Sequence, residues 1–298
     1  MAKLFNVNSD PQGTLIDYNK GLDNIPEAWR ETLGKGVTVA VMDSGINASH
    51  LSLTKTKIKS TFCSVDGLPV EDGMETNGHG TKVAAIIAAC GEEDANGTPV
   101  RGIRGIAPEA AIINCKISND GNYYEGPIQK AFEYLKTSYA EDPLVVNCSW
   151  NIAKSQSLTA MFNGLPDNFL CVCAAGNDDD LSDVELFFPS FLQKNISVGC
   201  FSDRSLISNM NESLEFFLCS GPVKSCGKNN SYADFENCSM TTAMVSGVLA
   251  LCLSANLGEH QNLTIGEIRN TLRALQSNQP YQSGLTIYNN PGSIKWTS

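Results

Sequence analysis

Short apolar segments that alternate with helix-like segments constrain the fold of this chain more than any other feature. Apolar runs of strand length cover residues 37–42, 110–117, 144–150, 169–177 and 195–201. Segments with a helical pattern cover residues 79–90, 125–140, 239–255 and 264–275. Continuous apolar runs are typical of strands that are buried on both faces. The alternation predicts an α/β fold with three layers, a doubly wound and mostly parallel sheet between helices.

The length and composition favour one domain. The chain has 298 residues, of which 42% are hydrophobic and 18% are charged, as in ordinary globular proteins. This length allows one large α/β domain or two smaller ones. No repeat, Pro/Ser tract or charge run marks a linker. We therefore expect a single domain over residues 1–298, in which residues 1–35 lead into the first strand.

The charge and the cysteines limit the partners and the compartment. A formal net charge of −11 argues against nucleic acid, because phosphate binding needs a basic face. No signal-peptide core is visible, and no segment approaches the roughly 18 apolar residues of a spanning helix. The eleven cysteines form no C-x-x-C pair, and several lie in apolar segments, which favours reduced thiols. We expect a cytoplasmic protein that does not bind nucleic acid and does not insert into membranes.

Four polar residues stand where the expected strands end or the expected helices begin. Asp43 follows the first strand and Asn177 closes the fourth, while His79 and Ser239 each open a helix. In open α/β sheets, functional groups gather at the carboxyl ends of the strands. One edge of the sheet is therefore expected to collect all four.

These residue types suit acyl transfer, which needs a nucleophile, a base, an acid that orients the base, and oxyanion donors. Of the three histidines, His50 and His260 lie in polar, loop-like segments. His79 lies in NGHGT at the start of a buried helix, between glycines that we interpret as room for a substrate backbone. Taken singly, each motif is more often structural: D-S-G as a turn, and Ser239 as a helix cap.

Taken together, four segments resemble a known family. VAVMDSGI, NGHGTKVAAIIA, VCAAGN and NCSMTTAMVSGVLAL occur in that order and resemble the signature segments of the subtilisin-like serine proteases. The order Asp, His, Ser is also that of the family. The lead-in AWRETLGKGVTVAVMDSGI, the segment VRGIRGIAPEAAIINCKI and the tail from EIRNTLRAL to SGLTIY are similar as well. About 270 residues are covered.

The resemblance implies roles for individual residues. Ser239 matches the nucleophile, His79 the general base and later acid, and Asp43 the carboxylate that orients His79. Asn177 matches the side-chain oxyanion donor, assisted by the backbone N–H of Ser239. Substrate is expected to add as an extended strand, with side chains held in pockets. The segments implied in substrate binding are Asp120, Gly121 and Asn122, then Ser149, Trp150 and Asn151, then Ala174, Ala175 and Gly176.

The chain departs from the family pattern around the nucleophile and at the primary pocket. Asn237 and Cys238 replace the usual Gly-Thr before Ser239, and Asn151 replaces a glycine of the pocket strand. A side chain at position 151 is expected to narrow or block the primary pocket, which puts substrate preference in doubt. Cys238 is read as a threonine-sized packing residue rather than a redox switch.

No cofactor is expected. Many members of the family bind calcium through an aspartate near the position of Ser52 and through a loop that here reads GEEDANGTPV. We interpret Glu92, Glu93 and Asp94 as a solvated charge run, since a calcium site needs six or more convergent oxygens. No prodomain is visible ahead of the first strand.

Three functions fit these observations. The first is an intracellular serine endopeptidase that processes a restricted set of substrates through an acyl-enzyme on Ser239. The second is a catalytically weak or inactive peptide-binding module, suggested by the altered residues around Ser239. The third is a peptide ligase, in which an amine rather than water accepts the acyl group. Retention of the complete set of catalytic groups favours the first.

Overall fold

The computed structural model describes residues 15–17, 32–177, 188–201, 214–219, 222–257, 265–274 and 286–289. The elements in chain order are β1 (Leu15–Asp17), β2 (Thr38–Asp43), β3 (Ile58–Cys63), α2 (His79–Ala88), β4 (Cys90–Glu93), β5 (Pro99–Arg104), β6 (Ala111–Lys116), α3 (Glu125–Tyr139), β7 (Leu144–Cys148), α4 (Gln156–Asn163), β8 (Phe169–Ala174), β9 (Ile196–Phe201), β10 (Phe216–Cys219), β11 (Val223–Cys226), η1 (Lys228–Asn230), β12 (Tyr232–Phe235), α5 (Cys238–Asn256), α6 (Ile265–Ala274) and β13 (Thr286–Asn289).

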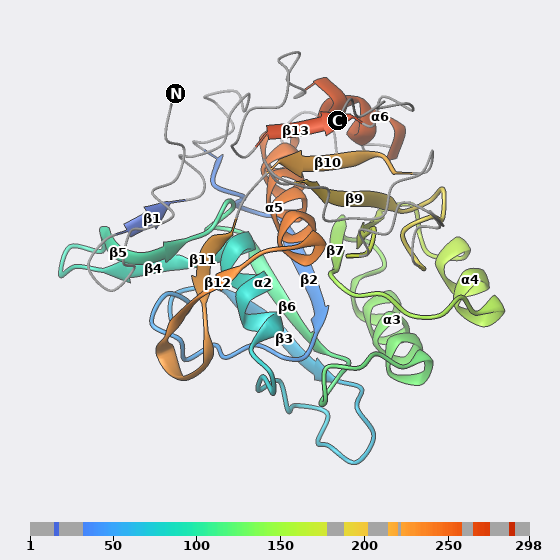
Figure 1. The fold of residues 1–298 in the computed structure, drawn as a ribbon, viewed down its shortest axis with the longest axis horizontal. Helices are drawn as coiled ribbons and strands as arrows, with labels where there is room; N and C mark the ends of the chain where they lie inside the picture. The colour runs from blue at the N-terminus through green and yellow to red at the C-terminus, as the bar shows by residue number, and fades with distance from the viewer. Residues whose placement is uncertain are drawn as a thin grey trace, which may run out of the picture.

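The centre of the fold is an eight-stranded sheet in the order β13-β10-β9-β8-β7-β2-β6-β3. Its neighbouring strands are parallel, except that β10 and β13 are antiparallel. Figure 1 shows the arrowheads of β2, β3 and β6 pointing towards the same lower edge of the sheet. The predicted α/β fold with a mostly parallel central sheet is confirmed.

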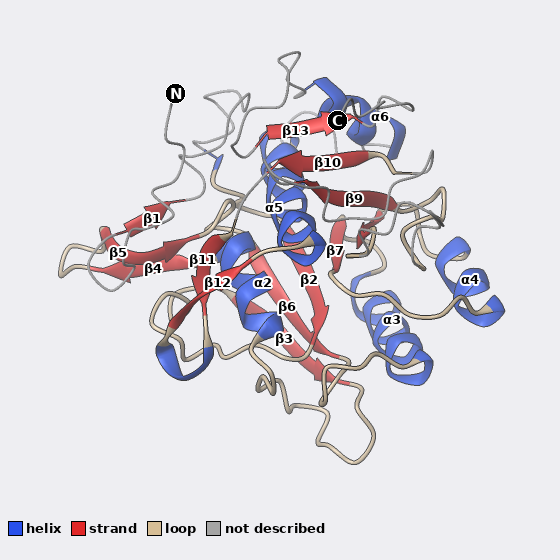
Figure 2. Cartoon of the chain, viewed as in Figure 1, coloured by secondary structure: helices blue, strands red, loops and turns tan. Residues whose placement is uncertain are grey.

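Two separate cores cover the two faces of the sheet, because successive side chains of a strand point to opposite faces. Val39 and Val41 of β2 belong to the core formed with α2 and α5. Ala40 and Met42 belong to the other core, which contains residues of α3 and α4. Figure 2 shows α2 and α5 together on one side of the strands, and α3 and α4 on the other. This arrangement explains why β2 is apolar without alternation.

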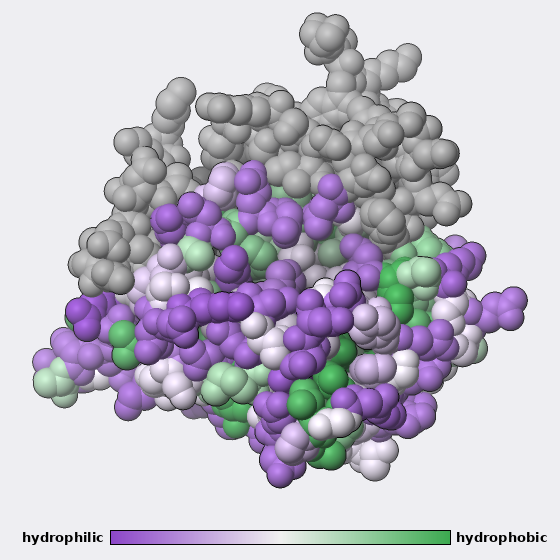
Figure 3. All heavy atoms as spheres, turned by 60° about the horizontal axis from the view of Figure 1, so that its bottom comes forward, coloured by the Kyte–Doolittle hydropathy of each residue, from purple (hydrophilic) through white to green (hydrophobic). Residues whose placement is uncertain are grey.

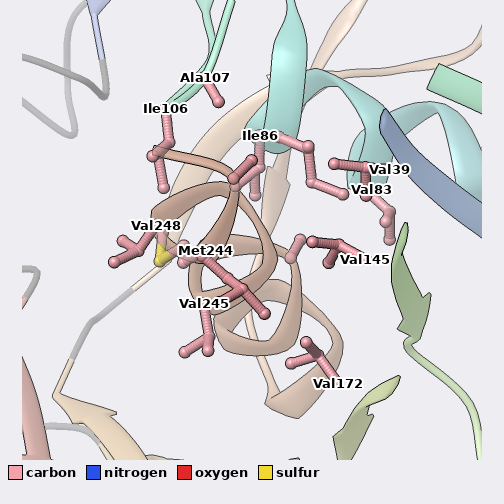
Figure 4. Close-up of a cluster of buried hydrophobic side chains, with 14 of the residues drawn as sticks. Val39, Val83, Ile86, Ile106, Ala107, Val145, Val172, Met244, Val245 and Val248 are labelled. Atoms are coloured by element: carbon pink, nitrogen blue, oxygen red, sulfur yellow. The ribbon is translucent and has the colours of Figure 1, made fainter. Parts of the chain in front are cut away.

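Helix α5 is the centre of the first core. Figure 4 shows Met244, Val245 and Val248 on α5, in one cluster with side chains of strands and of α2. Within the described residues, only α5 is long and apolar enough to cross a membrane, which the sequence analysis did not anticipate. However, 89% of its apolar window is buried inside the protein. A buried core helix accounts for this composition without a membrane.

Several elements were not predicted from the sequence. They are the short strand β1, the edge strand β3, the antiparallel pairs β4–β5 and β11–β12, the strand β10, the 3-10 helix η1 and the helix α4. Strand β3 is mostly half-buried, so its segment IKSTFC lacks the apolar run that marks the inner strands. Two predicted strands are also shorter than expected. Strand β7 ends at Cys148 rather than at residue 150, and β8 ends at Ala174 rather than at residue 177.

The lower face of the molecule is predominantly hydrophilic, and apolar side chains form only small patches on it (Figure 3). The large hydrophobic residues that are exposed include Val70 and Met74, both on the segment between β3 and α2. A surface of this kind agrees with the strongly acidic composition, which keeps a protein solvated.

Candidate active site

Asp43 ends strand β2 and is completely buried. Its carboxylate accepts a hydrogen bond from the backbone N–H of Ser44 at 2.7 Å. Both of its oxygens lie 2.9 Å from Nδ1 of His79. A buried carboxylate needs such partners, since an unpaired charge in the interior is very unfavourable. The structure therefore brings Asp43 and His79 together, as the sequence motifs predicted.

The first turn of α2 fixes the position of His79. The side chain of Asn77 accepts from the backbone N–H of His79 at 2.9 Å and from the hydroxyl of Ser44 at 2.6 Å. The Ser44 hydroxyl in turn accepts from the N–H of Gly80 at 3.2 Å. Two donors at the start of the helix, which have no partner within the helix, are satisfied in this way. The residue after Asp43 thus holds the helix that carries His79.

The glycine after His79 has a different role from the one expected. A Cβ at Gly80 would lie 2.3 Å from the carbonyl oxygen of Gly45 and 3.1 Å from Cβ of Asp43. Glycine is therefore required here so that α2 can approach the end of β2, and not to admit a substrate backbone. The interpretation drawn from NGHGT was wrong for Gly80 on this point.

The imidazole of His79 is positioned from several sides. Its ring meets the ring of Phe235 edge-on, with centroids 5.5 Å apart. Burial lowers the pKa of His79, but the charge of Asp43 and its hydrogen bond act more strongly together, so the pKa lies above 6.5. Because an ionised carboxylate only accepts hydrogen bonds, Nδ1 carries the proton and Nε2 is left as a base.

Ser239 lies in the first turn of α5 and is 6% exposed. Its hydroxyl donates to the carbonyl oxygen of Ser149 at 3.1 Å. The hydroxyl of Ser149 donates to the carbonyl oxygen of Ser239 at 3.0 Å. In this arrangement the hydroxyl proton of Ser239 is directed at Ser149, and it must leave that bond before it can be offered to His79.

A buried polar chain continues from Ser149 into the protein. The amide of Asn147 donates to the Ser149 hydroxyl at 2.9 Å, and its oxygen accepts from the hydroxyl of Ser246 at 3.0 Å. The Ser246 hydroxyl also lies 2.9 Å from the carbonyl oxygen of Thr242, one turn earlier in α5. These bonds join strand β7 to helix α5 and so position the start of α5, which carries Ser239, relative to the sheet.

Asn177 lies beyond the end of β8 and faces the start of α5. Its side-chain oxygen accepts from the backbone N–H of Cys238 at 2.9 Å. With the oxygen held in this way, the NH₂ group of the same amide remains as a donor beside the nucleophile. The structure therefore brings Asn177 to Ser239 from a distant part of the chain.

The residues implied in substrate binding lie in two different environments, one exposed and one buried. Asp120, Gly121 and Asn122 form a turn whose carboxylate accepts from Asn122 and from the hydroxyl of Tyr124. The side chain of Asn122 is the main cause that lowers the pKa of Asp120. Ser149, Trp150, Ala174, Ala175 and Gly176 are all buried. The structure thus supplies one exposed turn and two buried strand ends.

Asn151 joins the two strand ends. Its side-chain amide donates to the carbonyl oxygen of Ala174 at 2.8 Å. A glycine at this position would leave the space between the ends of β7 and β8 open. The side chain expected to narrow the pocket therefore extends across from one strand end to the other.

Tyr123 is a residue near the site that the sequence reasoning missed. Its hydroxyl donates to Oδ1 of Asp43 at 3.4 Å, and its ring stacks on Trp150 with centroids 5.7 Å apart. Burial and the nearby Asp43 charge raise the pKa of Tyr123 well above its usual value. Its neighbour Tyr124 bonds to Asp120 instead. Nothing in the sequence distinguishes the two tyrosines.

His50 takes no part in the site. It lies in the loop between β2 and β3, as its sequence context suggested, and it is buried there. Its Nε2 lies 2.9 Å from the carbonyl oxygen of Ser231, and its Nδ1 accepts from the N–H of Ser52. Burial lowers its pKa, so the imidazole is neutral and structural. His260 lies outside the described residues.

The cysteines in the described part of the chain are free, and most are buried. Burial raises the pKa of Cys115, Cys148, Cys171 and Cys173, which keeps these thiols protonated. Cys238 is also fully buried, and its thiol donates to the carbonyl oxygen of Gly176 at 2.6 Å. A buried and hydrogen-bonded side chain agrees with a packing role.

The bond between Asp43 and His79 and the position of Asn177 beside the start of α5 are parts of a serine hydrolase site, and comparisons with known proteins identify its family. The Subtilase family model matches residues 34–282. An intracellular serine protease of Paenibacillus polymyxa is 33% identical over 257 residues, which cover 82% of this chain and 74% of that protein. The major intracellular serine protease of Bacillus subtilis (strain 168) is 32% identical over 263 residues, with coverages of 85% and 77%.

A comparison of structures agrees with the sequence comparisons. A cold-adapted subtilisin-like serine proteinase superposes with a TM-score of 0.69 at 24% identity, covering 96% of this chain and 95% of that one. The chain therefore belongs to the subtilase family of serine endopeptidases. The family, fold class and enzyme class predicted from the sequence are confirmed.

Proposed function

We propose that this protein cleaves peptide bonds of a restricted set of substrates inside the cell, through an acyl-enzyme on Ser239. The observation that carries the proposal is the bond between Asp43 and His79 at the edge of the sheet where α5 presents Ser239. Every group that acyl transfer requires is contributed by a different element, and all are held by bonds to the backbone or to buried side chains.

The reaction follows from these positions. Nε2 of His79 takes the proton of Ser239 as Oγ attacks the substrate carbonyl carbon, and Asp43 stabilises the imidazolium that forms. The C–N bond then breaks as His79 gives the proton to the leaving amine. A water molecule attacks the resulting ester, His79 again moves the proton, and Ser239 is regenerated. Asn177 donates to the oxyanion in both halves of the reaction.

Two features support a narrow substrate range. The side chain of Asn151 spans the strand ends that resemble the walls of the primary pocket, so a large side chain has little room there. The turn at Asp120 is held by its own hydrogen bonds and presents Gly121 and Asn122 as an edge for an extended peptide. Substrates with a small residue before the cleaved bond fit this arrangement.

An intracellular location is supported by two independent observations. The two sequence relatives described above are named as intracellular serine proteases. The cysteines in the described part of the chain are free, which suits a reducing compartment. We also propose that the enzyme needs no calcium at the position used by many subtilases.

Labelling with a fluorophosphonate tests the proposal, because this probe reacts only with an activated and accessible serine. Wild type should label, and the Ser239→Ala and His79→Ala variants should not. Mass analysis of cleaved peptides then separates hydrolysis, in which water is added, from transfer to an amine. A folded wild type that does not label and does not cleave peptides would instead support the binding-module function.

A further inference from the structure

The start of helix α5 leaves no backbone donor free for an oxyanion. The first helical N–H groups of an α-helix lack partners within the helix and must bond elsewhere. Here the N–H of Cys238 donates to Asn177, and those of Met240 and Thr241 donate to the carbonyl oxygen of Asn237. The remaining one, the N–H of Ser239, donates to the side-chain oxygen of Asn237 at 2.9 Å.

Asn237 adopts a conformation that ordinary residues avoid. Its φ is 105° and its ψ is 179°, a region that is populated almost only by glycine. Asparagine is strained there, and its side chain is turned onto the N–H of Ser239 rather than into solvent. The amide oxygen thus lies within hydrogen-bond distance of a donor at which negative charge would develop during acyl transfer.

From this geometry we propose that Asn237 is a latch on the oxyanion site: its side chain holds the Ser239 N–H and must release it before that N–H can bind an oxyanion. The inference rests on the proposed function of Ser239. With the latch closed, the side-chain NH₂ of Asn177 is left to bind the oxyanion without the N–H of Ser239. With the latch open, the backbone N–H becomes the second donor.

The magnitudes make such a latch workable. A helix cap of this kind is worth roughly a factor of 5 in an equilibrium. An oxyanion donor is worth about 10²–10³ in turnover. The transition state can therefore displace the latch, while a substrate carbonyl in the ground state, which binds more weakly, leaves it closed. Because the latch opens only in the transition state, the free energy of opening it should lower kcat and leave KM unchanged.

The experiment compares Asn237→Gly with wild type and with two further variants. Glycine suits the φ of 105° and removes the competing oxygen, so kcat for a peptide substrate should rise about 5-fold with KM unchanged. A peptide aldehyde, whose adduct with Ser239 carries the oxyanion, should bind tighter by the same factor. Asn237→Asp keeps the shape but adds a stronger acceptor and a negative charge, and should lower kcat at least 10-fold.

Asn230→Gly is the matched control, because Asn230 also has a positive φ, of 59°, but lies exposed in η1. It should change neither kcat nor aldehyde affinity. A folded Asn237→Gly with unchanged or lower kcat would overturn the latch, and so would an unchanged aldehyde affinity. Labelling of wild type with the fluorophosphonate distinguishes the two proposals. If wild type is labelled and the Asn237→Gly results are negative, the latch is wrong and the proposed function stands.

Discussion

Ser149 and Ser239 are joined by two hydrogen bonds that run in opposite directions. The hydroxyl of Ser239 donates to the carbonyl oxygen of Ser149, and the hydroxyl of Ser149 donates to the carbonyl oxygen of Ser239. Strand β7 is thereby tied to the first turn of α5. The nucleophile is held by the residue that directly follows β7, and this residue also accepts from the buried amide of Asn147.

Replacement of Ser149 by alanine should therefore destabilise the protein. It leaves the amide of Asn147 and the carbonyl oxygen of Ser239 without their partner in a buried site, at a cost of about 1–3 kcal/mol in the free energy of unfolding. Urea denaturation followed by circular dichroism measures this. The control Ser138→Ala, at an exposed position in α3, should change the free energy by less than about 0.5 kcal/mol. Equal effects of the two substitutions would contradict the structural role of Ser149.

The pH at which activity rises should depend on Asp43, because the Asp43 charge raises the pKa of His79. Only neutral His79 can accept the serine proton, so the acid limb of kcat/KM follows its pKa, which lies above 6.5. In Asp43→Asn the raising effect is removed and burial, which lowers the pKa, remains. The limb should then move below 6.5, while kcat falls by roughly 10⁴ because the tautomer is no longer fixed. A limb that stays at the wild-type position would refute this assignment.

Tyr123 should tune His79 through Asp43. Its hydroxyl donates to the carboxylate, so Tyr123→Phe leaves more of the Asp43 charge for His79 and should move the acid limb to higher pH. The fall in kcat should be less than about 10-fold, since phenylalanine preserves the stacking on Trp150. Tyr124→Phe is the control, because that hydroxyl contacts Asp120 instead. The idea fails if both variants give the same profile.

The sequence was sufficient to predict the inner strands and insufficient for the edges. Strand β2 is buried on both faces, so every residue of it is under the same apolar constraint and the run is visible in the sequence. Strand β3 borders solvent and pairs with β6 across a register shift. It is therefore a strand because of its pairing with β6, which is distant in the sequence. Its pattern alone does not distinguish it from a loop.

The candidate site shows the same division. Asp43, His79 and Ser239 could be predicted because each stands at a strand or helix end in a recognisable motif. The turn of the Asn237 side chain onto Ser239 and the inward position of Tyr123 could not. Both depend on backbone dihedrals and on rotamers, which a single sequence does not encode locally.

Removal of divalent cations should leave the enzyme intact. At the position where many subtilases have a calcium-binding aspartate, the hydroxyl of Ser52 lies 2.9 Å from the hydroxyl of Tyr232. The nearby Glu92 lies in β4 and forms an ion pair with Arg101 at 2.7 Å, so it is not simply a solvated charge as the sequence suggested. These groups are satisfied by the protein itself. We expect EDTA to change neither the melting temperature nor kcat, and a marked loss of either would show that a cation is required.

Asn151 should determine which residue is accepted before the cleaved bond. Its amide crosses from the end of β7 to the carbonyl oxygen of Ala174 at the end of β8, so Asn151→Gly opens the space between them. The ratio of kcat/KM for a peptide with phenylalanine at this position to that for alanine should rise at least 10-fold, as expected when a large apolar side chain gains a pocket. Asn151→Ala, which removes the crossing amide but keeps Cβ, should give an intermediate ratio. If the glycine variant hydrolyses both peptides more slowly and in the wild-type ratio, Asn151 supports the strand ends and does not select the substrate.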